Sequence, residues 1–196
     1  MGFEIGLFNL WLLFFAGYSI ISGAMTLANK KRGIPIEDPD NYTSYDKKNR
    51  FLMGQLPFLL LFIMSIFLPI NDGPLFWAGL ALYLAGIFIN LLAMHSFSRQ
   101  KGGLITSGIY RFSRNPMYIG GLLFMAGLLL INGSMSIAAG IFLLLAFVWL
   151  ATVHWNVIKE EQVMKEKYGS DFDHFFESVP RYIGSPQKSK ALKSHL

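Results

Sequence analysis

Two adjacent glutamates follow the longest uncharged stretch of the chain, and their position suggests chemistry. Residues 115–158 carry no formal charge, and Glu160 and Glu161 come directly after Lys159. We expect at least one carboxylate to lie near the hydrocarbon edge, where an ionisable group without a partner is costly and is a functional candidate. Adjacent helical residues point about 100° apart, so only one of the two need face a pocket. A solvated helix end is the alternative interpretation.

A second group of polar residues has the pattern of a helix start. In the run from Arg114 to Tyr118, Asn115 is predicted to cap the helix and Pro116 to occupy its first turn. Free amides at a helix N-terminus attract anionic groups such as a carboxylate. Tyr118 lies one turn further on and is expected to face whatever binds there. A plain helix start with an interfacial aromatic residue is the alternative.

Glycines and aromatic residues flank these groups. Gly102, Gly103 and Gly108 lie in one loop, where they permit tight turns and close approach of the backbone to a ligand, or simply connect two spans. After the glutamates, two short amphipathic helices are predicted along the membrane face. They divide at Gly169, and Ser170 is expected to cap the second. Their aromatic residues either cover a pocket or anchor the chain at the interface.

Several kinds of site are excluded or disfavoured. The chain has no cysteine, which excludes disulfides, cysteine-ligated zinc and thiol nucleophiles. His95 and His154 lack the spacing to a second histidine or a carboxylate that a metal site requires, so we predict no metal.

The elements that position these residues are predicted to be membrane-spanning helices. Hydrophobic residues make up 53% of the chain, which exceeds the range of roughly 45–50% apolar residues in soluble proteins. The mean hydropathy is +0.43. Residues 115–158 would span about 66 Å as helix, or twice the roughly 30 Å hydrocarbon core, so we expect a break at residues 132–134. The predicted spans are Ile5–Ala28, Phe51–Ile70, Leu75–Met94, Pro116–Ile131 and Met135–Ile158.

The basic residues predict the orientation. Of 17 lysines and arginines, six lie between Lys30 and Arg50, four between Arg99 and Arg114, and seven from Lys159 onward. The positive-inside bias therefore places the N-terminus outside and the C-terminus in the cytosol. The fold class is all-α: a polytopic membrane protein with about five transmembrane helices and short interfacial C-terminal helices. The net charge of +5 favours membrane lipids as partners and no nucleic acid, because the basic groups are juxtamembrane.

The C-terminal half carries motifs that together resemble a known superfamily. The motifs are Leu104-Ile105-x-x-Gly108-Ile109-Tyr110, Arg114-Asn115-Pro116-x-Tyr118-x-Gly120, Glu160-Glu161, Tyr168-Gly169 and Val179-Pro180-Arg181. In this order they resemble the isoprenylcysteine carboxyl methyltransferase and phospholipid methyltransferase superfamily, over roughly residues 104–183. The first three spans match only in hydropathy. The carboxyl methyltransferases usually have Arg-His-Pro at residues 114–116, whereas Asn-Pro-Met-Tyr is like the phospholipid N-methyltransferases, so the acceptor stays open.

The resemblance implies a cofactor, a reaction and a site. Members of that superfamily bind S-adenosyl-L-methionine in a cytosol-facing pocket and methylate lipid-soluble or lipid-anchored acceptors. Carried over by position, the cofactor-binding residues are Leu104, Ile105, Gly108, Tyr110, Asn115, Pro116, Tyr118, Glu160 and Glu161. We assign catalytic roles to Arg114 and Glu161: Arg114 or Arg181 would hold a carboxylate acceptor, and Glu161 or a tyrosine would assist deprotonation of an amine.

Other functions and the division of the chain complete the predictions. An NADPH-dependent reductase of a sterol-like lipid and a non-enzymatic membrane protein with a retained fold are the alternatives. We expect N-terminal helices in residues 1–95 with a cytosolic loop at 29–50, a cofactor-binding region at 96–184 and a flexible tail at 185–196. The predicted location is the cell (inner) membrane in a prokaryote and the endoplasmic reticulum in a eukaryote.

Overall fold

The computed structural model describes residues 9–33, 55–100 and 103–184. Most of the loop predicted at 29–50, the start of the first two spans and the tail at 185–196 lie outside these residues. Within them the chain is all-helical, which confirms the predicted fold class. The proposed division at residue 95 stays a prediction. The helices are α1 (Trp11–Arg32), α3 (Leu56–Ser65), α4 (Leu75–Arg99), η3 (Gly108–Arg111), α5 (Pro116–Asn132), α6 (Ile137–Tyr168) and α7 (Ser170–Ser178).

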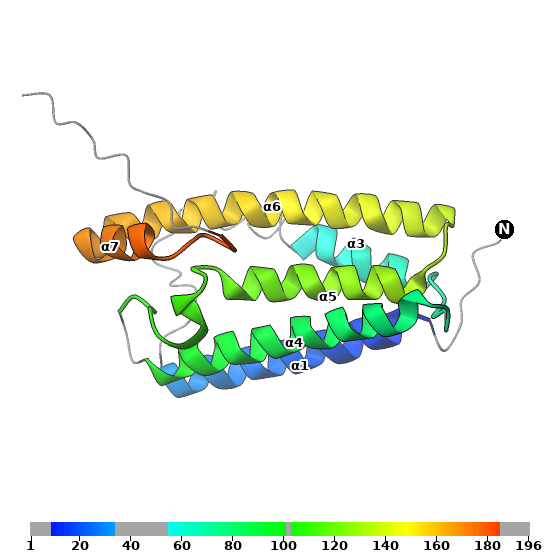
Figure 1. Cartoon of the computed structure of the whole chain (residues 1–196), viewed down its shortest axis with the longest axis horizontal. Coiled ribbons are helices and arrows are strands. Elements are labelled where there is room, and N and C mark those ends of the chain that lie inside the picture. The colour runs from blue at the N-terminus through cyan, green and yellow to red at the C-terminus, as the bar shows by residue number, and fades with distance from the viewer. Residues whose placement is uncertain (1–8, 34–54, 101–102, 185–196) are drawn as a thin grey trace, which may run out of the picture.

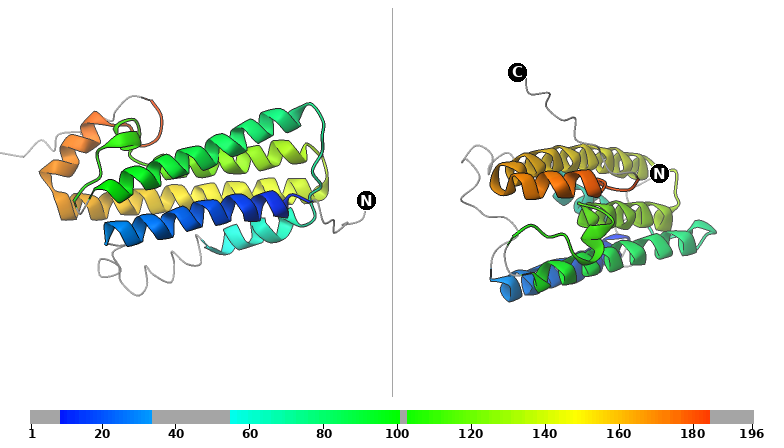
Figure 2. Two further views of the ribbon diagram at one scale, coloured as in Figure 1. Left: turned by 90° about the horizontal axis from the view of Figure 1, so that it is seen from below. Right: turned by 60° about the vertical axis from the view of Figure 1, so that its left-hand side comes forward.

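The long helices lie side by side in one bundle (Figure 1). In this view α5 lies between α4 and α6, α1 runs along α4, and α3 lies beside α6. Helices α1 and α4 run in the same direction, and α5 runs in the opposite direction. Figure 2 shows the same bundle from below, with α7 folded at one end of it. The described lysines and arginines all lie toward that end, which we call the basic end: the ends of α1, α4 and α6, the start of α5, and the segments beside them.

Among the described residues, three helices are long and apolar enough to cross a membrane, namely α1, α4 and α6. Helix α5 has 17 residues, about 25 Å at 1.5 Å per residue, and α3 has 10. Both are apolar but shorter than the roughly 20 residues that a full span needs. The predicted total of about five spans is therefore not confirmed and stays a prediction.

Glycines bring α4 and α5 into backbone contact. Gly79 and Gly86 on α4 lie seven residues apart, as do Gly120 and Gly127 on α5, so each pair falls on one helical face. A Cβ added at Gly86 would lie 2.5 Å from the Phe124 backbone nitrogen and 2.6 Å from the Gly120 oxygen. Small residues at such crossings let membrane helices pack closely. The pair of helices thereby holds both ends of the loop at 100–115 in a fixed place.

Some helix boundaries confirm the predictions and others differ from them. The break at 132–134 is confirmed, because α5 ends at Asn132 and Gly133 adopts a left-handed conformation with φ 55°. However, α6 continues without interruption through both glutamates to Tyr168, so the first predicted amphipathic helix is part of α6. The division at Gly169 is confirmed. Ser170 is the first residue of α7 and makes no capping hydrogen bond, so the cap predicted there is wrong.

Candidate functional site at the basic end

The loop before α5 is held by contacts from α1 and α4. Gly108 has φ 63°, which favours glycine, and a Cβ there would collide with the side chain of Ser96 on α4. The Ile109 amide donates to Ser96 Oγ at 3.4 Å. From α1, Arg32 Nη2 donates to the Gly103 carbonyl at 3.1 Å. Gly108 therefore has a structural reason to be glycine whether or not a ligand binds nearby.

Apolar contacts dock α7 onto this loop. Tyr110 in η3 is buried, and it belongs to a cluster with Ala93, Phe172, Phe175 and Val179. Leu104 and Ile105 pack partly buried against the same cluster. Burial raises the pKa of Tyr110 above its ordinary value, the charge of Arg32 lowers it and the charge of Glu160 raises it further. Three of the predicted cofactor residues thus lie between the bundle and α7.

The start of α5 departs from the predicted capping. Pro116 is buried in the first turn, as predicted. Asn115 occupies the N-cap position, but its side chain makes no capping bond, so the predicted cap is wrong. Its Nδ2 instead donates to the Arg181 carbonyl at 3.2 Å, and Ser113 Oγ donates to the same oxygen at 3.2 Å. The Arg114 amide donates to the Pro180 carbonyl at 3.0 Å. The C-terminal segment after α7 is thereby fastened to the start of α5.

Glu161 lies between two arginines. Arg181 donates to its carboxylate through Nε at 3.1 Å and Nη2 at 2.7 Å, and Arg114 Nη2 forms an ion pair with Oε1 at 3.1 Å. The Arg114 side chain is only 2% exposed, and its guanidinium stacks 4.0 Å from the centre of the Phe176 ring. Burial lowers the pKa of Arg114 and the charge of Glu161 opposes this, whereas the hydrogen bond that Arg181 donates to Glu161 raises the pKa of Arg181. Both arginines remain cationic.

Glu160 has different partners from its neighbour. The Tyr118 hydroxyl lies 3.2 Å from both oxygens of the Glu160 carboxylate, across the interface of α5 and α6. The two adjacent glutamates therefore face two environments, as the 100° separation predicted. Glu160 meets a neutral hydroxyl, and Glu161 meets two cations.

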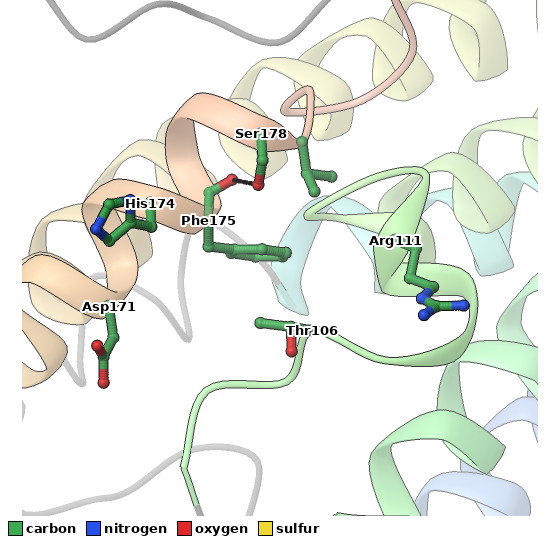
Figure 3. Close-up of a pocket in the computed structure, with 7 residues that line it drawn as sticks. Thr106, Arg111, Asp171, His174, Phe175 and Ser178 are labelled. Carbon is green, nitrogen blue, oxygen red and sulfur yellow. Dashed lines mark hydrogen bonds between the residues drawn. The ribbon is translucent and has the colours of Figure 1, made fainter.

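A cavity of about 460 Å³ opens between the loop and α7. Figure 3 shows the residues that line it, with α7 on one side and the loop on the other: Thr106, Arg111, Asp171, His174, Phe175, Ser178 and Val179. None of the predicted cofactor residues is among them. They lie instead in the polar group around the glutamates and in the apolar cluster under α7.

Four contacts were not predicted from the sequence. Arg32 reaches the loop from α1, Ser113 and Asn115 bind the Arg181 carbonyl, and His154 Nδ1 lies 3.1 Å from the Tyr182 hydroxyl. The partners are separated by 71, 68, 66 and 28 residues, and no periodic pattern links them. By contrast, the seven-residue spacing of glycines on α4 and α5 was visible in the sequence.

The fold and the site together define a membrane protein with a polar, cation-rich site at one end of its helical bundle. Residues 75–171 match the family model described as phospholipid methyltransferase. This match confirms the resemblance to the phospholipid methyltransferase family, a family of membrane methyltransferases, over just under half of the chain. No curated protein and no solved structure matches the chain. The matched residues include both glutamates and Tyr118 but not Arg32 or Arg181.

Proposed function

We propose that the chain is an S-adenosyl-L-methionine-dependent methyltransferase that methylates a lipid-soluble or lipid-anchored acceptor at the cytosolic face of the membrane. The observation that carries the proposal is the meeting of α5 and α6 at the basic end. There Tyr118 contacts Glu160 and Arg114 contacts Glu161, all within the segment that matches the family. The predicted site residues from the two helices are therefore neighbours.

The polar groups at this end fit the functional groups of the cofactor. Glu160 can accept hydrogen bonds from ribose hydroxyls or an amino group. Nε of Arg114 is buried and has no hydrogen-bond partner among the described residues, so it is a donor that a carboxylate can use. Leu104, Ile105, Gly108 and Tyr110 would line one side of the site, and Asn115, Pro116 and Tyr118 the other.

The residues of the chain act in this mechanism by binding and alignment. When bound, the cofactor would supply a methyl group on a positively charged sulfur. The acceptor would attack the methyl carbon in line with the sulfur and release S-adenosylhomocysteine. The protein needs to hold donor and acceptor together and exclude water, and this alignment lowers the barrier without a covalent nucleophile. The aromatic residues under α7 provide the cover that excludes water from the loop side.

The ligand-free contacts refine the assignment of catalytic roles. Glu161 holds Arg114 and Arg181, so we assign it first to positioning these two cations. A carboxylate acceptor, as in a prenylcysteine, would bind to the same arginines. For a phospholipid amine, Glu160 with Tyr118 is better placed to accept a proton, because the Tyr118 hydroxyl contacts its carboxylate, whereas two cations bind Glu161. The description of the family supports the phospholipid amine.

A methyl-transfer assay tests the proposal and separates the acceptors. Detergent-purified protein is incubated with methyl-labelled S-adenosyl-L-methionine and either phosphatidylethanolamine or a farnesylated cysteine, and the organic phase is counted. Label that survives mild base indicates an amine product, and label released as methanol indicates a methyl ester. Protein that transfers no label to either acceptor, but oxidises NADPH in the presence of a sterol-like lipid, would overturn the proposal.

A further inference from the structure

A groove between α1 and α4 lies outside the methyltransferase site. Its volume is about 210 Å³, and one face of each helix forms its walls. The wall residues repeat at intervals of three and four or seven, as residues on one helical face do. They include Ala24, Leu27 and Lys31 from α1 and Leu91, Met94 and Ser98 from α4.

The groove changes from apolar to polar along its length. Helices α1 and α4 run in the same direction, so Lys31 and Ser98 lie together at the basic end (Figure 1). Ala24 and Leu91 lie seven residues before them, about 10 Å deeper in the bundle. His95 also lines the polar end. A groove with this arrangement matches an amphiphile that lies parallel to the helices, with its polar head at the basic end.

The polar end of the groove carries positive charge, and α1 and α4 contribute no acidic residue to balance it. Lys31 forms no hydrogen bond or ion pair with any described residue, and Lys30 and Arg32 are its neighbours in the last turn of α1. Arg99 ends α4, and neither helix contains an aspartate or glutamate. Cations at helix C-termini also complement the helix dipole, but the dipole does not account for an apolar groove that leads to Lys31.

We propose that this groove binds one anionic phospholipid, with its phosphate at Lys31 and part of an acyl chain between Leu27 and Leu91. Basic pockets between membrane helices bind anionic headgroups in this way. The groove shares no residue with the proposed methyltransferase site, although its Ala28 and Met94 pack in one cluster with Ile105. A lipid bound there stabilises the folded chain, because it binds the packed helices and not the separated ones.

Native mass spectrometry of the detergent-purified chain tests the proposal. The protein is titrated with phosphatidylglycerol and, separately, with phosphatidylcholine of the same acyl chains. We expect tighter binding of the first lipid, and about a fivefold loss of its affinity in Lys31→Gln, which is the effect of one basic residue near an anionic surface. Lys30→Gln is the matched control, because it removes the same charge one position away and outside the groove. Its affinity is expected to be unchanged.

Equal affinity for the two lipids, or equal losses in the two lysine variants, would overturn the proposal. So would displacement of the lipid by an equal concentration of glycerophosphoglycerol, which has the headgroup but no acyl chain. Ala24→Phe fills the apolar part of the groove and is expected to abolish binding of phosphatidylglycerol. Undiminished binding in this variant would also contradict the proposed location. If Ala24→Phe does not fold, the comparison of the two lysine variants still decides.

Discussion

At the scale of single residues, Glu161 is the acid with the strongest constraints. Replacing it with glutamine leaves the buried Arg114 guanidinium without its counter-charge. Removing one partner of a buried pair costs roughly 3–5 kcal/mol, but the glutamine oxygen still accepts one hydrogen bond, so we expect Glu161→Gln to lose about 2 kcal/mol of stability. Thermal unfolding in detergent measures this. Glu166→Gln on the exposed side of α6 is the control and is expected to be neutral.

Tyr110 gives the fold a dependence on pH. Burial raises its pKa in the folded chain above the ordinary value of about 10, so the folded state holds the proton more tightly than the unfolded state. Its contribution is fully present below about pH 10 and is lost as the pH rises toward the folded pKa. Unfolding followed from pH 8 to 11 should show a decline that is smaller in Tyr110→Phe. Identical profiles for the two proteins would contradict this assignment.

The sequence predicted where residues lie along a helix better than it predicted which residues they contact. Pro116 starts α5, as its position predicted, and both glutamates contact residues at the start of that helix. Asn115 has the residue type of a cap, but the Arg181 carbonyl, 66 residues away, accepts its side-chain hydrogen bond instead. Local capping rules describe a helix end by itself and carry no information about a distant segment that binds the same side chain.

At the scale of elements, the close packing of α4 and α5 is the feature that positions the loop. Gly86→Ala places a methyl group against backbone atoms of α5 that no side-chain rotation can move. We expect a loss of about 1–3 kcal/mol, the usual cost of overpacking. Gly23→Ala on α1 is the control, because a Cβ there meets nothing within 4 Å. Equal unfolding midpoints for the two variants would show that this contact does not hold the helices together.

The hydropathy pattern located the apolar helices but not all their ends. Predicted span and observed helix agree for α5 and for the start of α4, but α4 continues past the predicted end at Met94 to Arg99. The last span was predicted to end at Ile158, yet α6 continues to Tyr168. Partners from α5 and the C-terminal segment bind both glutamates there, so these charges are accommodated within the helix and do not mark its end.

At the scale of the whole molecule, the predicted orientation makes the two ends of the bundle chemically distinguishable. The chain has no cysteine, so Met135→Cys and Ser178→Cys each introduce a single thiol, the first between α5 and α6 and the second at the end of α7. In intact cells an impermeant maleimide should label only Met135→Cys, and Ser178→Cys should react after permeabilisation. The reverse pattern would invert the orientation, and labelling of both in intact cells would contradict a spanning α6.

Calorimetric titration tests the cofactor assignment most directly. Detergent-purified protein is titrated with S-adenosyl-L-methionine, S-adenosylhomocysteine and NADPH, and wild type is compared with Glu160→Gln and the control Glu166→Gln. We predict saturable binding of the first two compounds by wild type and the control, at least about tenfold weaker binding by Glu160→Gln, and no binding of NADPH. Binding of NADPH alone would contradict the account in favour of a reductase, and binding of none by folded protein would favour a non-enzymatic role.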